Sequence, residues 1–371
     1  MTYKEEKGIS LKQLIAMFVL ASAAPLVRSI PGLAAKTAGA AAWFSPLIVI
    51  LLGILSVITL NKLINGIKGK DGNKINIKNL DDVLCITYGK IVGRIICVVY
   101  IVWLIILMAV QTRLFAERFV ITLLIYAPVD FFIISMLVIV YIMSRLRVEA
   151  FGRFSQVFSL LLVVIFGIII LSISKDITIN NLLPVTFYDT KNILLLAFEI
   201  AGICCFFTYG LFFGEKILDK GNIKKEKFHI VLPVVIIALI TILTTIGVFG
   251  YRVTGNFAQA FSMALKSISI FGSIERIESV LIAFWVVADM GFVVFFMIAT
   301  SNLAKNTFKL SSRKVAILPI VILLYIVVML LAKSYIYLID FVGMVIIPLN
   351  LLFGFVIPIM TLGVAKCRKL V

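Results

Sequence analysis

Six charged side chains interrupt stretches of this sequence that are otherwise apolar. They are Arg28, Arg113, Glu117, Arg118, Glu199 and Asp289. A charge in the hydrocarbon of a bilayer is costly, so charged residues there almost always face the interior of a helix bundle or a water-filled path. Each of the six is therefore a candidate for binding a ligand, carrying a proton or joining two helices.

Arg28 stands between Pro25 and Pro31 in the first apolar stretch. A cation fixed at this point could bind the carboxylate of a ligand or take the place of a coupling sodium ion. The alternative is that its long side chain reaches the outer surface of the membrane, as arginines near helix ends often do. The sequence leaves both roles open.

Arg113 and Glu117 are four residues apart, which on a helix puts them on one face together with Ala109. Burial in a medium of low dielectric constant favours a protonated glutamate that can carry a proton, whereas an adjacent arginine favours the ionised form. The spacing therefore favours a structural ion pair over a proton relay.

Asp289 is the most deeply placed acid, near the centre of its apolar stretch. It could bind an ammonium group, carry a proton or hold another helix. Small residues at Ala23, Ala24 and Gly202 would leave room for a small ligand, over which an aromatic side chain could close. The candidate ligand-binding residues are Ala23, Ala24, Pro25, Arg28, Ala109, Arg113, Gly202, Phe206, Trp285 and Asp289, and the candidates for proton or ion coupling are Glu117 and Glu199.

The elements that must position these residues are membrane-spanning helices. A transmembrane helix needs about 20 mostly apolar residues, and this chain of 371 residues is 62% apolar with a mean hydropathy of +1.17. The sequence predicts an all-α polytopic membrane protein with a single domain over residues 1–371 and a further helix on the membrane face at 79–94. Ten spans are expected near 10–40, 43–64, 93–121, 129–147, 150–173, 190–218, 230–252, 275–304, 314–333 and 336–363.

The net charge of +17 is concentrated in alternate loops, which argues against a nucleic-acid partner and for an oriented membrane protein. Lysine and arginine in short loops mark the cytoplasmic side of a bilayer. The basic clusters lie at 62–94, 145–153, 216–227, 305–314 and 366–369, besides the N-terminus. Both termini are therefore expected in the cytoplasm, with an even number of crossings.

The first and sixth spans are irregular. Two prolines and Gly32 interrupt the first, and Gly202, Gly210 and Gly214 interrupt the sixth. Interrupted helices in corresponding positions of two halves indicate a binding site at the midplane of a transporter-like fold. The halves would be residues 9–173 and 190–364. The alternative is that proline and glycine only kink two tightly packed helices.

Enzyme chemistry finds no support in the sequence. It contains no phosphate-binding loop, nucleophile elbow or dinucleotide fingerprint, and its five cysteines lack metal-ligand spacing. The single histidine, His229, stands beside two lysines in a basic loop, as on a solvated face. We therefore expect no enzyme activity, cofactor or metal.

Five segments together resemble the B subunit of GerA-type spore germinant receptors, a branch of the amino acid–polyamine–organocation permease superfamily. The resemblance covers the whole chain. The segments are Ile9-Ser10 with Gln13; Ile30-Pro31-Gly32 followed by Ala35-Lys36 and Ala38-Gly39; Arg113-x-Phe115-Ala116-Glu117; Leu183-Pro184-Val185; and Glu275-Arg276-Ile277-Glu278 running into Ile282-Ala283-Phe284-Trp285-Val286.

This resemblance implies a LeuT-like bundle of ten helices, built as a five-plus-five inverted repeat with helices 1 and 6 broken. The Pro31-Gly32 pair would mark the break in helix 1, and Glu117 would be the family's glutamate in the third span. The bundle would bind a small germinant such as an amino acid and act with partner A and C subunits in the inner membrane of the spore.

Three functions are compatible with such a bundle. It could be a germinant-sensing receptor subunit, a proton-coupled amino-acid permease that uses Glu117 or Glu199, or a scaffold without a ligand of its own. The fold does not separate them, because one scaffold can host several functions.

Overall fold

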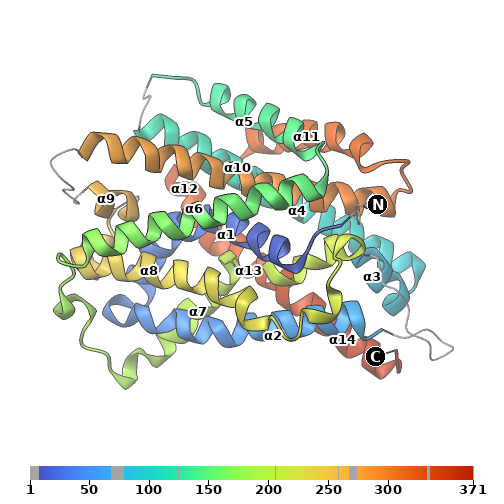
Figure 1. Ribbon diagram of the computed structural model, residues 1–371, viewed down its shortest axis with the longest axis horizontal. Coiled ribbons are helices and arrows are strands. Elements are labelled where there is room, and N and C mark those ends of the chain that lie inside the picture. The colour runs from blue at the N-terminus through green and yellow to red at the C-terminus, as the bar shows by residue number, and fades with distance from the viewer. Residues whose placement is uncertain are drawn as a thin grey trace, which may run out of the picture.

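The computed structural model describes residues 8–67, 79–122, 126–204, 206–257, 259–266, 274–331 and 335–370, without the side chains of residues 122, 206, 266 and 274–282. Its helices run mostly along the longest axis of the molecule (Figure 1). In chain order they are α1 (Leu11–Thr37), α2 (Ser45–Asn65), α3 (Leu80–Tyr88), α4 (Lys90–Thr122), α5 (Val129–Ser144), α6 (Val148–Ile173), α7 (Thr190–Cys204), α8 (Lys227–Thr254), α9 (Ala260–Lys266), α10 (Ile274–Thr307), α11 (Arg313–Leu330), α12 (Tyr335–Phe341), α13 (Ile347–Leu351) and α14 (Ile357–Cys367).

The number of spans agrees with the sequence prediction. Within the described residues nine apolar helical segments are long enough to cross a membrane, and α5, with 16 residues, is a shorter tenth. The tenth predicted span corresponds to α12, α13 and α14 together. Of the helix expected at 79–94, the first part is present as α3, which buries Leu80, Val83 and Leu84. The chain turns at Gly89, where φ is +94°, and residues 90–94 begin α4 instead.

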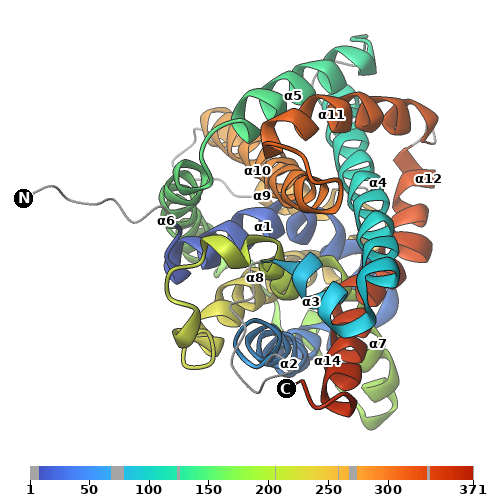
Figure 2. The ribbon, with the colours of Figure 1, turned by 90° about the vertical axis from the view of Figure 1, so that its right-hand side faces the viewer.

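The first helix is the core of the bundle. Of the most apolar stretch of α1, 89% is buried, against 28% for α6, whose outer face is left for lipid. Helix α1 packs against α6, α7, α8 and α10, and Figure 2 shows it near the middle of the bundle. A helix that is apolar all round is stable only when it is enclosed in this way.

Two polar residues from the resemblance begin this helix. The hydroxyl of Ser10 accepts a hydrogen bond from the backbone N–H of Gln13 at 3.3 Å, and Oε1 of Gln13 accepts one from the N–H of Ser10 at 3.1 Å. This capping box satisfies two backbone donors that a helix start leaves unpaired. The adjacent Ile9 forms a parallel bridge with Ile217, which ties the start of α1 to the end of the sixth span.

The first span is not unwound where an interruption was expected. Helix α1 is continuous from Leu11 to Thr37, with Pro25 and Pro31 inside it. Each proline removes one backbone N–H from the helix, but α1 packs on four neighbouring helices and remains continuous. The Pro31-Gly32 pair therefore marks a missing hydrogen bond and not a helix end.

The sixth span does change its form. Helix α7 ends at Cys204, and the described chain resumes as η4 (Phe206–Lys216), a 3₁₀ helix of 11 residues. Runs of 3₁₀ helix longer than three or four residues are uncommon and mark strain or a hinge. The change of helix type comes shortly after Gly202, within the segment where the glycine cluster predicted an irregular helix.

The tenth span contains two turns of π-helix that the sequence did not predict. They are η6 (Val342–Ile346) and η7 (Leu352–Val356), on either side of α13. The wider turns leave carbonyls to other partners: Thr208 donates to the carbonyl oxygen of Gly354 at 2.5 Å, and Tyr100 to that of Phe353 at 2.8 Å. These bonds join the tenth span to the sixth and third.

The start of α1 and the end of α14 lie at the same end of the bundle, on the right of Figure 1. Helix α3 lies there too. This arrangement agrees with the even number of crossings inferred from the basic loops.

Candidate ligand-binding site

A cluster of buried polar side chains joins α1, α4 and α10. Oδ1 of Asp289 accepts hydrogen bonds from Nη1 of Arg28 at 3.2 Å and from Nε2 of Gln111 at 2.6 Å. Its Oδ2 accepts from Arg118, and Arg28 also donates to Oε1 of Gln111. Asp289 is wholly inaccessible to solvent, and Arg28 is 8% exposed. The sequence found three of these four residues but did not predict that they meet.

Helix geometry explains why these side chains converge. Gln111 and Arg118 are seven residues apart on α4, close to two full turns, so they point to the same side. Helix α10 packs against both α1 and α4 and presents Asp289 to them. A buried carboxylate without partners would be strongly destabilising, and here three donors compensate it. Among the roles left open for Asp289, the structure supports the contact between helices.

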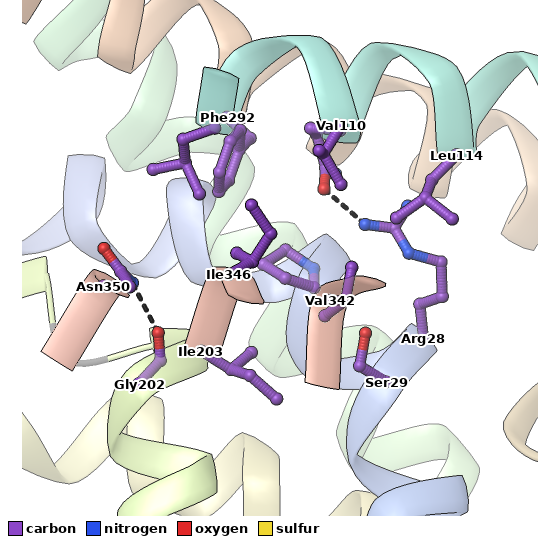
Figure 3. A pocket seen from close by; sticks show the side chains of 13 residues that line it. Arg28, Ser29, Val110, Leu114, Gly202, Ile203, Phe292, Val342, Ile346 and Asn350 are labelled. Atoms are coloured by element: carbon purple, nitrogen blue, oxygen red, sulfur yellow. Dashed lines mark hydrogen bonds between the residues drawn. The ribbon is translucent and has the colours of Figure 1, made fainter. Parts of the chain in front are cut away.

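A small cavity, which we call the central cavity, lies beside the cluster, and Arg28 belongs to both (Figure 3). Its volume is about 40 Å³, which is room for a few waters. The walls come from α1, α4, α7, α10, η6 and α13. The lining residues are Pro25, Arg28, Ser29, Leu107, Val110, Gln111, Leu114, Gly202, Ile203, Phe292, Val342, Ile346 and Asn350.

Asn350 ties one wall of this cavity together. Its amide donates to the carbonyl oxygen of Gly202, and its Oδ1 accepts from the hydroxyl of Tyr209 at 2.8 Å (Figure 3 shows the first of these bonds). Tyr209 in turn accepts from Nε1 of Trp103 at 3.3 Å. The chain of bonds holds the sixth and tenth spans to α4. Sequence reasoning missed Asn350 and Gln111, although an uncharged amide within an apolar span was an available signal.

A larger cavity of about 290 Å³, which we call the outer cavity, opens on the other side of Arg28. It lies between α1, the end of α8, α9 and α12, and Lys36, Asn256 and Asp340 contribute polar groups to it. Arg28, Ser29 and Val342 line both cavities. Arg28 therefore stands between the outer cavity and the central one. It does not reach the surface, because it is bonded to Asp289 and Gln111.

Several predicted ligand-binding residues lie away from the central cavity. Trp285 packs edge-on against Phe166 and Phe261, on the side of α6 and α9. Ala23, Ala24 and Ala109 are buried but absent from the cavity lining. The side chain of Phe206 is outside the described part of the chain. Pro25, Arg28 and Gly202 do line the cavity.

The predicted pair on α4 is formed. Nε and Nη2 of Arg113 donate to Oε1 of Glu117 at 2.9 and 2.6 Å, and both side chains are nearly buried. Neither side chain hydrogen-bonds to the Asp289 cluster among the contacts seen in the described residues. The geometry is that of the structural ion pair.

Glu199 lies outside the central site. Its Oε2 accepts a hydrogen bond at 3.0 Å from Thr37, the last residue of α1. Thr37 is nine residues beyond Arg28, which is about 13 Å along a helix. Glu199 therefore lies near the C-terminal end of α1. Gly32 lines the larger of the two cavities beside Arg28.

Gly202 is expected to tolerate no side chain. A Cβ atom there would lie 2.8 Å from Cγ2 and 2.9 Å from the carbonyl oxygen of Ile347, so α7 and α13 would have to separate. We expect Gly202→Ala to lower the free energy of unfolding by about 1–3 kcal/mol. The control is Gly167→Ala on α6, where a Cβ would meet nothing within 4 Å. Thermal unfolding of the purified variants measures both, and equal stability would contradict the close packing.

The comparisons with known proteins agree with this architecture. A profile of the family described as "Spore germination protein" matches residues 8–336. A comparison with curated protein sequences gave no match. Among solved structures, that of MhsT in complex with L-phenylalanine is 13% identical in sequence, with a TM-score of 0.69 over 95% of this chain and 90% of that chain.

A second similar structure is that of Mhp1, a nucleobase-cation-symport-1 family transporter, in a closed conformation with bromovinylhydantoin bound. It is 10% identical, with a TM-score of 0.54 over 90% of this chain and 75% of that chain. At these identities the likeness shows the fold. The chain has the LeuT-like fold expected from its sequence.

Proposed function

Because this chain belongs to the spore germination protein family, we propose that it is a germinant-sensing membrane subunit whose ligand binds at the central cavity. The ligand would be a small nutrient such as an amino acid. MhsT, which has a similar fold, was solved with L-phenylalanine, and this supports the same class of ligand.

The observation that carries the proposal is the environment of Arg28. The residue lines the central cavity, and its Nε is buried without a hydrogen-bond partner in the described structure. A buried donor without a partner is unfavourable, and a ligand carboxylate could supply the missing acceptor. Because the guanidinium is a permanent cation, the site could hold a carboxylate without a sodium ion.

The size of the cavity links binding to a change of conformation. A volume of about 40 Å³ is too small for an amino acid, so α1, α7 and the tenth span must separate to admit one. A ligand favours the open arrangement only by its higher affinity for that state. We propose that this shift reaches the partner A and C subunits at the inner membrane of the spore, with both termini of this chain in the cytoplasm.

A proton-coupled amino-acid permease is the alternative function. It is favoured by the fold, which is shared with the transporter Mhp1, and by the outer cavity that leads to Arg28. The two hydrogen bonds that Arg113 donates to Oε1 of Glu117 and the distance of Glu199 from the central cavity argue against a proton carrier at this site.

Uptake and equilibrium binding distinguish the two functions. The purified chain in liposomes would be given a labelled amino-acid panel, with and without an inward proton gradient. We expect saturable binding without accumulation, unchanged in Glu117→Gln and Glu199→Gln. Gradient-driven accumulation that is lost in either variant would establish the permease, and the absence of both binding and uptake would leave a scaffold subunit.

A further inference from the structure

A third cavity lies at the end of the bundle where the chain begins, far from the Asp289 cluster along the helices. Its volume is about 240 Å³, and it lies between the end of η4, the last turns of α10 and the start of α11. The polar groups that matter for its chemistry are those of Lys216, Asn302, Lys305, Asn306, Ser312 and Arg313. No part of the proposed germinant function uses them.

Two lysines in this cavity form no ion pair with another described residue. Lys216 and Lys305 are both half-buried, and neither ammonium group pairs with a carboxylate in the described structure. Arg313 already has hydrogen-bond partners, because it donates to the carbonyl oxygens of Ser144, at 3.0 Å, and Leu146 at the end of α5. The cavity therefore contains two available cations, held in place by the ends of two different spans.

One carboxylate, that of Glu215, also lines the cavity. It is exposed, and it forms no ion pair with Lys216 or Lys305 in the described structure. Asp81 accepts a hydrogen bond from Asn306 at 2.9 Å. Glu149 pairs with Arg147 at 3.5 Å.

We propose that this cavity binds a phosphoryl group, either the headgroup of an anionic phospholipid or free phosphate. Lys216 and Lys305 would supply charge-assisted hydrogen bonds. The hydroxyl of Ser312 accepts from the backbone N–H of Lys314, so its proton is available for an oxygen of the anion. Basic pockets between membrane helices on the cytoplasmic side are known to take phosphorylated lipid headgroups. The bound anion would tie η4 to α10.

The test compares phosphate with lipid on the purified full chain in a neutral detergent. One arm measures the melting midpoint in inorganic phosphate against chloride at equal ionic strength. The other counts bound phosphatidylglycerol against phosphatidylcholine by native mass spectrometry. Each arm uses the wild type, Lys216→Gln/Lys305→Gln, and the control Lys224→Gln/Lys225→Gln, which removes two exposed cations at the same end.

We expect the Lys216→Gln/Lys305→Gln variant to weaken binding by about tenfold or more, since each charge-assisted bond contributes over ~1 kcal/mol, and the control to behave as the wild type. A loss confined to phosphatidylglycerol identifies a lipid site, and a loss confined to phosphate identifies a free-anion site. The proposal is wrong if neither anion distinguishes the two double variants. Amino-acid binding at the central cavity is measured on the same samples, so the failure of one proposal leaves the other intact.

Discussion

Asp289→Asn is expected to lower the free energy of unfolding of this protein by about 3–5 kcal/mol, the range for breaking a buried ion pair. The carboxylate accepts from Arg28, Arg118 and Gln111 in a site closed to solvent. Asparagine has almost the same size, so packing is preserved while the only negative charge in the cluster is removed. The melting midpoint of the purified variant measures the effect.

Two further variants make this prediction specific. Asp219→Asn removes an exposed carboxylate, and its effect should stay within about 0.5 kcal/mol. The triple variant Asp289→Leu/Arg28→Met/Arg118→Met removes all three charges, and it should recover much of the loss because apolar replacement of a whole buried ionic cluster is often nearly neutral. A triple variant less stable than Asp289→Asn would show that the cluster does more than balance charge.

Arg28→Met is expected to weaken binding of a carboxylate germinant by about tenfold to about a hundredfold, the range for losing a hydrogen bond to a charged group. Methionine keeps most of the apolar length of the side chain, and Asp289 keeps its bonds to Gln111 and Arg118. The fold should therefore survive where Asp289→Asn weakens it. Equilibrium binding of labelled amino acids to the variant in liposomes gives the affinity.

The control for this second prediction is Lys36→Met. Lys36 lines the outer cavity but not the central one, so its replacement tests whether any nearby cation suffices. Affinity unchanged in Lys36→Met and lost in Arg28→Met would place the carboxylate at Arg28. Amides of the same amino acids, which lack the carboxylate, should bind weakly to wild type and equally weakly to Arg28→Met. An equal loss of affinity in Lys36→Met and Arg28→Met would contradict a site at Arg28.

The span count and most of the buried charges could be predicted because both follow from the properties of the bilayer. Glu149, in a basic segment at the start of α6, is buried as well and was not among the six candidates. Each of the ten apolar stretches can be recognised from its own residues, and a charged residue within such a stretch differs clearly from its apolar neighbours. The Arg113–Glu117 pair was predictable for a similar reason, since its partners are one helical turn apart. By contrast, Arg28 and Asp289 are 261 residues apart, and only the packing of α1 on α10 brings them together.

Helix register explains why some of the candidate residues lie apart from the central cavity. Glu199 is three residues before Gly202, which lines that cavity, yet the direction of α7 carries it toward Thr37. The π-turns of the tenth span were not predicted, although Pro348 and Pro358, which follow them directly and supply no N–H to the preceding turn, were visible in the sequence. The bonds from Thr208 and Tyr100 to the carbonyls of Gly354 and Phe353 were not, because they join different spans. The prolines of α1 were visible, but whether they unwind the helix depends on its neighbours.

The 3₁₀ form of η4 makes this part of the sixth span longer than an α-helix of the same sequence. Over its 11 residues the difference is about 5 Å, because a 3₁₀ helix rises about 2.0 Å per residue and an α-helix about 1.5 Å. Conversion of η4 to α-helix would draw its end toward the centre of the membrane by nearly one helical turn. Ile9, which is bridged to Ile217 just beyond that end, would be pulled with it. A change at the central cavity could thus become an axial displacement at the end of the bundle where the chain begins.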